Sequence, residues 1–287
     1  MRIRRQLSWT LGLLLVTACA RADEPATPVA VVDKGRQPTT RAKDPEGMRR
    51  LDREAPVWID VKRKRVVMVA EVCLREGQLE MFACPKGTKE HESVLSVPVR
   101  ASTVHAALLA VGAVPGNPAH WAPEFEPARG TPIEITLFWT DEQGNRRRAR
   151  AQDWIRQAKY LGGMLGDLST RVPYWVRRIK IGEAMEQSWV FGGSELRVDE
   201  QTGAKMYLAD YGEFICVSNF PAAMLDVPVE SSDKAGELQF EAYSSRIPPL
   251  GTKITLVLTP KPEKITKEKR ETNAEETRAE GAAPENR

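Results

Sequence analysis

Residues 65–74 read RVVMVAEVCL, a run rich in β-branched side chains that predicts a β-strand. Just before it, residues 57–62 (VWIDVK) alternate with a period of two, which predicts a second strand. Just after it, the turn Glu76-Gly77 leads into a third expected strand at 78–83. The globular part of the chain therefore begins with strands joined by short turns.

The same patterns predict further strands at 132–140, 188–198, 204–209, 213–218, 236–243 and 252–259. A helix is expected at 101–113, with Ser102 as its N-cap and Gly112 near its end, and a short one at 151–159. Strands dominate and turns are frequent. The expected fold class is therefore α+β, with mainly antiparallel β-sheet and a few short helices.

An internal similarity raises a further option for the architecture. Residues 129–137 (RGTPIEITL) resemble residues 250–258 (LGTKITLVL), at an offset of 121. A true duplication would give two related halves with a cleft between them. The alternative is two similar glycine–threonine strand starts.

The first residues indicate export. Residues 1–22 read as a signal peptide, because a basic start is followed by an apolar stretch, Leu7 to Ala18, that is too short to span a bilayer comfortably. The run Val16-Thr17-Ala18-Cys19 resembles a bacterial lipobox, in which Cys19 becomes lipidated. Ordinary signal-peptidase cleavage and an uncleaved anchor are the alternatives. We expect a protein on the periplasmic side of the envelope, attached to the membrane by lipid on Cys19.

Two segments differ in composition from the rest. Residues 23–53 contain four prolines and few large apolar side chains, and residues 261–287 have Ile265 as their one large aliphatic residue. Such segments bury too little surface to offset their conformational entropy. We therefore expect a disordered linker at 23–53, a globular domain at 54–260 and a disordered charged tail at 261–287.

Cysteine usage follows from the export prediction. If Cys19 is lipidated, Cys73, Cys84 and Cys216 remain, which allows one disulfide and one spare thiol in an oxidising compartment. Cys84 and Cys216 both flank polar loops, so this is the preferred pairing. Three buried free thiols are the alternative.

Composition excludes some classes of function. The 287 residues are 41% hydrophobic, enough for a sizeable core, and 42 basic against 39 acidic residues leave a net charge of only +3. That balance argues against a nucleic-acid partner. The sequence also lacks zinc-finger spacing, a P-loop and a Rossmann glycine fingerprint.

The most concentrated polar segment follows an expected strand and supplies candidate ligand-binding residues. These are Lys89, His91, Glu92 and Ser93, together with His105 on the helix that follows. Imidazole and carboxylate groups suit zinc or a similar divalent metal, so His91, Glu92 and His105 could form a three-ligand site. Their spacing is not that of H-E-x-x-H. The alternative is a structural role, with solvated charges and hydrogen-bonded histidines.

Nucleophilic catalysis has weaker candidates. Ser93 lies near His91, and Ser194 follows a glycine pair in residues 191–195 (FGGSE), but the nucleophile-elbow pattern G-x-S-x-G is absent. A glycine pair between strand residues more often marks a bulge or bend.

Several segments together resemble the YdjY-domain family. They are residues 86–93 (KGTKEHES), 104–109 (VHAALL), 112–116 (GAVPG), 151–155 (AQDWI), 189–194 (WVFGGS), 215–221 (ICVSNFP) and 248–252 (PPLGT). The resemblance spans about 54–260, and its form is closest to exported members from planctomycete-like bacteria. It implies no established activity.

The resemblance places the family signature on Lys89, His91, Glu92 and His105. The sequence departs from the family in two respects. Residues 158–187 are longer than the usual connection, and no ferredoxin-like cysteine run is present, so no iron–sulfur cluster is expected.

We therefore expect a non-enzymatic envelope protein that binds a small ligand or an envelope protein near His91 and His105. The alternative is a metal-dependent enzyme, hydrolase-like, that uses His91, Glu92 and His105 as ligands or acid–base groups. A third interpretation treats the polar segment as a hydrogen-bond network that maintains the fold.

Overall fold

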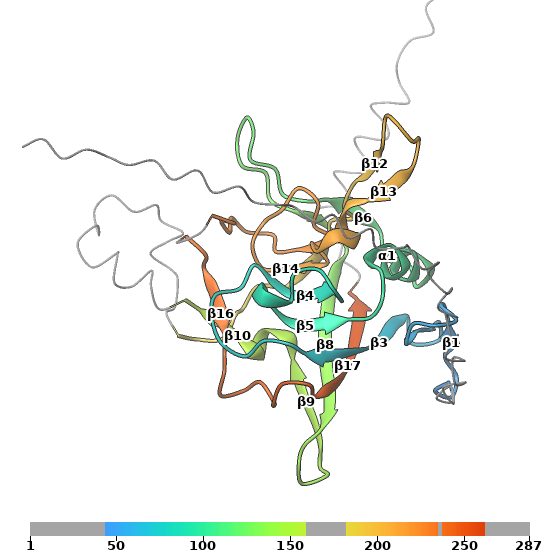
Figure 1. Cartoon of the computed structure of the whole chain (residues 1–287), viewed down its shortest axis with the longest axis vertical. Helices are drawn as coiled ribbons and strands as arrows, with labels where there is room; N and C mark the ends of the chain where they lie inside the picture. The colour runs from blue at the N-terminus through green and yellow to red at the C-terminus, as the bar shows by residue number, and fades with distance from the viewer. Residues whose placement is uncertain (1–43, 159–181, 235–236, 262–287) are drawn as a thin grey trace, which may run out of the picture. The chain divides into compact units, whose positions relative to one another are not determined.

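Eight strands close into a barrel in the computed structural model, which describes residues 44–158, 182–234 and 237–261 (Figure 1). In order around the barrel they are β3 (Arg65–Val72), β17 (Lys253–Pro260), β8 (Pro132–Thr140), β11 (Trp189–Phe191), β15 (Leu225–Asp226), β14 (Ile215–Cys216), β4 (Met81–Pro85) and β5 (Ser93–Val97). The pairing of β5 with β3 closes the ring. All neighbours are antiparallel except β4–β5 and β14–β15, which are parallel.

The expected α+β class with several helices is wrong. The described residues are mostly β, with one α-helix, α1 (Ala101–Ala110). The helix expected at 151–159 is instead a 3-10 turn, η2 (Ala151–Trp154), followed by β10 (Ile155–Gln157). β10 pairs with β16 (Phe240–Ala242), so partners distant in sequence hold this segment extended.

The two related halves are also not formed. β8 and β17, which contain most of the similar segments, are direct antiparallel neighbours in one barrel, with Leu137 opposite Leu256. The described residues all belong to a single compact unit that starts at Asp44. No cleft between halves is therefore available as a site.

Strands outside the ring extend it. β1 (Arg49–Arg50) and β2 (Val57–Asp60) continue the sheet beyond β3, and β9 (Arg146–Arg150) pairs with β8. β1 lies inside the segment expected to be a linker. It is ordered there because Asp44 accepts hydrogen bonds from Arg50 Nε at 2.5 Å and Trp58 Nε1 at 3.0 Å.

One continuous hydrophobic core packs the barrel strands together with the segments that border them. Its largest fully buried aromatic side chains are Phe82, Trp154, Trp189, Phe191, Phe214 and Phe240. An eight-stranded barrel has an interior just wide enough for side chains to fill. Burial of these rings contributes to the hydrophobic stabilisation of the fold.

α1 begins directly after β5, and Val104 and Leu108 bury one face of the helix in the barrel core. Its N-cap is Arg100 rather than the expected Ser102. The helix ends as expected near Gly112, which has a φ of +90°. Among the helices of the described segments, none is long and apolar enough to span a membrane.

The strand expected at 188–198 is interrupted. β11 ends at Phe191, and a hairpin of β12 (Leu196–Val198) and β13 (Lys205–Tyr207) begins after the break. Gly193 and Ser194 have φ values of +98° and +56°, which turn the chain away from the barrel wall. Ser194 is held in this unusual conformation because its Oγ donates to Ala222 O at 2.6 Å and its N–H donates to Ala223 O.

A second small hairpin, β6 (Pro115–Asn117) with β7 (Arg129–Gly130), passes closely over β11. A Cβ on Gly130 would lie 2.0 Å from Phe191 O, and Gly130 has a φ of +139°. Only glycine therefore allows this approach.

We expect Gly130→Ala to destabilise the protein by about 3–5 kcal/mol, because backbone strain adds to a steric overlap with β11. Gly144→Ala is the matched control, since Gly144 also has a positive φ, +83°, but open space around it. It should cost only about 1–2 kcal/mol. Urea unfolding measures both, and equal losses would contradict the close approach.

Candidate functional site

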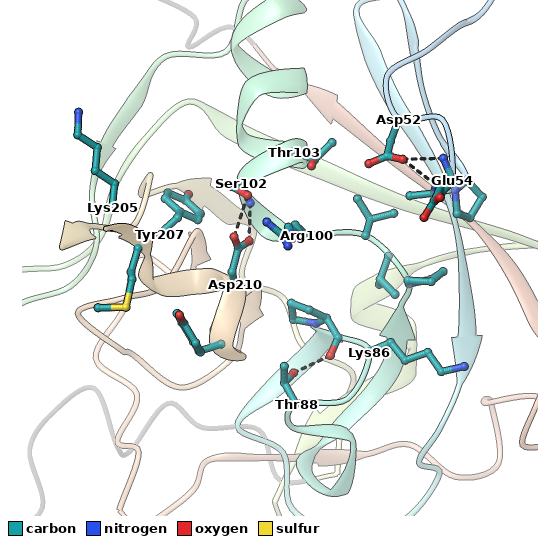
Figure 2. Close-up of a pocket in the computed structure, with 18 residues that line it drawn as sticks. Asp52, Glu54, Lys86, Thr88, Arg100, Ser102, Thr103, Lys205, Tyr207 and Asp210 are labelled. Carbon is teal, nitrogen blue, oxygen red and sulfur yellow. Dashed lines mark hydrogen bonds between the residues drawn. The ribbon is translucent and has the colours of Figure 1, made fainter. Parts of the chain in front are cut away.

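A cleft lies where the first turn of α1 faces β13 and η4 (Leu208–Tyr211). It consists of two hollows that share Ser102 and Tyr207 as walls. The larger, the polar hollow, has a volume of about 910 Å³ and is lined from segments 52–56, 85–88, 97–103 and 205–211 (Figure 2). The smaller, the glycine hollow, has a volume of about 420 Å³ and is lined by Ser102, His105, Pro115, Gly116, residues 192–194, Leu196 and Tyr207.

Two carboxylates of the polar hollow are engaged by neighbouring groups. Asp210 accepts the Ser102 N–H and the Ser102 Oγ–H, both at 2.8 Å, which fixes η4 to the start of α1. Asp52 accepts the N–H groups of Ala55 at 2.9 Å and Glu54 at 2.7 Å, and these bonds lower its pKa. These carboxylates therefore maintain the walls of the hollow.

Three cations of the polar hollow are not engaged in this way. Lys86, Arg100 and Lys205 make no side-chain hydrogen bond or ion pair to any residue that the structure describes. Arg100 is close enough to help lower the pKa of Asp52 without pairing with it. Figure 2 shows Arg100 in the middle of the hollow, with Lys205 and Lys86 at opposite ends. The charged side chains of the hollow that lack an ion-pair partner among the described residues are therefore cations.

The glycine hollow contains a fixed histidine. His105 Nδ1 lies 2.8 Å from Tyr207 Oη, and Tyr207 Oη lies 2.9 Å from Gly193 O. A carbonyl only accepts, so the hydroxyl proton of Tyr207 is donated to Gly193. The Tyr207 oxygen must then accept from His105, which assigns the imidazole proton to Nδ1 and leaves Nε2 as the basic nitrogen.

Burial decides the charge of this pair. Burial lowers the pKa of His105, and the Gly193 carbonyl offsets only part of that effect. Burial likewise raises the pKa of Tyr207, and the negative charge of Asp210 adds to it. The His105 ring also packs edge-on against Phe191, with ring centroids 4.8 Å apart. The glycine hollow therefore presents a neutral imidazole whose Nε2 can accept a hydrogen bond or a proton.

Lys89, from the predicted polar segment, forms ion pairs within the fold. Its Nζ lies 3.2 Å from Glu92, 3.4 Å from Glu80 and 3.5 Å from Glu213, and 4.8 Å from the centroid of the Phe220 ring. Burial alone would lower the pKa of Lys89, but the three carboxylates outweigh burial and raise it. An ammonium group held charged in this way links three segments and is a poor nucleophile.

The structure does not assemble the expected metal ligands. The His91 side chain is 77% exposed and lies 3.7 Å from Glu92 Oε2, whereas His105 contacts Tyr207, Phe191 and Gly193. Within the described segments, no group of three or more His, Cys, Asp or Glu side chains is arranged to hold a metal ion. The metal-dependent alternative therefore lacks its ligand set in this fold.

Ser93 and the cysteines lie away from the cleft. Ser93 begins β5, and its buried Oγ has no hydrogen-bond partner within the described part of the chain, while its carbonyl accepts from Cys73 Sγ at 3.1 Å. The expected Cys84–Cys216 disulfide is absent, and Cys73, Cys84 and Cys216 are all free. The two side chains have different neighbours, because Cys216 packs against Met81 whereas Cys84 faces the side chain of Ser93. Burial raises the pKa of all three thiols, which disfavours the thiolate form that acts as a nucleophile. Cys19 lies outside the described residues.

Sequence reasoning found His105 and the 191–195 segment but missed Tyr207 and Asp210. Both lie in or beside a segment expected only as a strand, and they contact residues more than 100 positions away. No local pattern in the sequence could have joined them to α1.

Asp226 was also missed. It is fully buried and accepts N–H groups from Val227 at 2.8 Å, Asn219 at 3.0 Å and Ala119 at 3.3 Å. Burial raises its pKa to about 7, although these bonds oppose the shift. The carboxyl joins β15 to the loops that contain Ala119 and Asn219.

Comparison with known proteins gave one match. A family model described as the YdjY domain matches residues 57–259, well over half of the chain. No curated protein and no solved structure matches.

We expect His105 to titrate below its usual pKa of about 6.5, because the charged ring is desolvated. Since the unfolded chain then binds the proton more readily, protonation on acidification destabilises the fold. Nitrogen-15 NMR should also show the neutral ring protonated at Nδ1. The urea-unfolded protein serves as the reference. A higher pKa in the folded protein, or a proton on Nε2 in the neutral ring, would contradict the proton assignment.

Proposed function

Because the chain belongs to the YdjY domain family, we propose that it is a ligand-binding module of an exported envelope protein, and that an anionic ligand occupies the polar hollow. The supporting observation is a set of cations, Lys86, Arg100 and Lys205, that have no ion-pair partner among the described residues. They line a hollow where Asp52 and Asp210 are already engaged. An anion there gains charge-assisted hydrogen bonds without breaking an existing ion pair.

The size and rigidity of the hollow support this proposal. A volume of about 910 Å³ lies within the range of about 300–1,000 Å³ typical of sites for small ligands. The Asp210–Ser102 bonds and the Tyr207–His105 bond both tie the β13–η4 segment to α1. A wall fixed before binding reduces the entropy that a ligand would otherwise have to offset.

We expect glutarate, a five-carbon dicarboxylate, to shift the amide NMR signals of residues 100–103 and 205–211. The five-carbon diamine 1,5-diaminopentane, of the same length and opposite charge, should leave them unchanged. Arg100→Gln should weaken glutarate binding about fivefold or more, because one charge-assisted contact is lost. Arg146→Gln, which removes an exposed arginine far along the sequence, is the matched control.

The anionic-ligand proposal fails if glutarate causes no shifts at tens of millimolar, the range of weak millimolar binding. It fails equally if the diamine causes the same shifts, or if Arg100→Gln and Arg146→Gln bind glutarate alike.

We also propose that lipid on Cys19 anchors the protein to the periplasmic side of the envelope. The support is the basic start, the short apolar stretch and the lipobox-like Val16–Cys19. Several acyl chains bury enough methylenes for firm attachment, at about 0.8 kcal/mol each.

Cells fed labelled palmitate should incorporate the label into the wild-type protein and into Cys73→Ser, but not into Cys19→Ser. Label retained by Cys19→Ser would contradict lipidation at this cysteine. Loss of label in both variants would also contradict it, since Cys73 lies in the folded domain.

A further inference from the structure

The β12–β13 hairpin has an open edge of known hydrogen-bonding pattern. Leu208 N donates to Glu195 O, and Asp199 N donates to Ala204 O, so these two residue pairs are hydrogen-bonded pairs. In an antiparallel ladder, bonded and non-bonded pairs alternate. The pairs Leu196–Tyr207 and Val198–Lys205 are therefore the non-bonded ones.

It follows that the backbone N–H and C=O groups of Lys205 and Tyr207 point away from β12. No backbone hydrogen bond from another described segment reaches either residue. The Tyr207 carbonyl, as the N-cap of η4, accepts the first bond of that turn. Two donors, the N–H groups of Lys205 and Tyr207, and one acceptor, the Lys205 carbonyl, thus have no partner among the described residues on an edge of three residues, Lys205–Tyr207.

This open edge borders the polar hollow. All three residues of β13 line the hollow, as do Tyr211 and Asp210 immediately beyond it. Figure 2 shows β13 on one side of the hollow and the segment of Asp52 and Glu54 on the other, with Arg100 between them.

The remaining walls suit an extended chain. Pro56, Pro85 and Pro98 line the hollow with Val97 and Val99, so this part is apolar and presents few N–H donors. The cations are spread from Lys205 through Arg100 to Lys86 rather than gathered at one point. A ligand that met all of these features would be long, would carry alternating backbone donors and acceptors, and would combine acidic with apolar groups.

We propose that the natural ligand of the polar hollow is an extended acidic peptide segment that adds to β13 as a third strand. This proposal rests on the proposed function and names the class of its ligand. A small anion satisfies the cations but leaves the Lys205 N–H and C=O and the Tyr207 N–H unpaired, whereas a strand reaches both residues at its two-residue repeat of about 6.8 Å. Main-chain bonds supply affinity in this binding mode, and alternate side chains supply specificity.

The test uses the peptide acetyl-Glu-Val-Glu-Val-Glu-amide and two N-methylated analogues of the same charge. One analogue is methylated at the first, third and fifth residues, and the other at the second and fourth. Because a strand pairs through alternate residues, at least one analogue should bind ten or more times more weakly than the parent peptide. Equal binding of all three peptides by isothermal titration calorimetry would overturn strand addition.

A pair of protein variants tests the same edge. Lys205→Ala removes the charge and keeps the N–H, whereas Lys205→Pro removes both without breaking a bond to β12. We expect Lys205→Pro to bind the parent peptide at least tenfold more weakly than Lys205→Ala does. Equal binding by the two variants overturns the proposal. If Lys205→Pro does not fold, the N-methylated peptides on the wild-type protein decide.

Glutarate binding distinguishes a failure of strand addition from a failure of the anionic-ligand proposal. Suppose that glutarate still shifts the signals of the hollow in an Arg100-dependent way, but the N-methylated analogues bind like the parent peptide. The anionic-ligand proposal then stands, and strand addition is overturned. If neither glutarate nor any of the peptides perturbs the hollow, both proposals are overturned.

Discussion

The pairing of β3 with β5 is the constraint on which the rest of this structure depends. Val72 opposite Leu95 and Glu71 opposite Ser96 join the two ends of an eight-stranded path. Without this contact the sheet would have two open edges and an exposed apolar face. The closure also fixes the end of β5, and α1 follows β5 directly, so the position of the helix is set by the ring. The cleft exists because a helix fixed in this way meets a hairpin that leaves the barrel.

Two kinds of bond hold that hairpin against the helix. The positive φ values of Gly193 and Ser194 turn the chain outward from β11. The Asp210–Ser102 hydrogen bonds then hold the following segment against the first turn of α1. His105 and Tyr207 add a neutral bridge beneath. Polar side chains with complete partners make these walls rigid, because breaking any one of them would leave a half-buried group unsatisfied. The cations of the polar hollow differ from these groups, because they have no such partner within residues 44–158, 182–234 and 237–261.

Charge is used in opposite ways in two regions of the domain. Around Lys89, one ammonium group joins three carboxylates of which each side chain is about one-fifth exposed, and the result is a closed network that needs no ligand. In the polar hollow, Asp52 and Asp210 accept from backbone and side-chain donors of their own walls, and the cations have no ion-pair partner among the described residues. The two regions therefore differ in which charged groups have partners within the described part of the chain.

Secondary-structure elements with a strong local signal could be predicted from the amino-acid sequence. Residues 132–140 form the predicted strand, residues 65–72 and 253–260 nearly so, and α1 starts where expected and ends near Gly112, because β-branched runs and glycine act within a few residues. The family, too, was recognisable from short motifs. Only the tertiary structure decided that residues 155–157 are extended, that the sheet closes, and that His105 meets Tyr207 while His91 stays in solvent. These outcomes depend on contacts between segments far apart in the chain, and hydrophobic periodicity carries no information about which distant partner a segment will find.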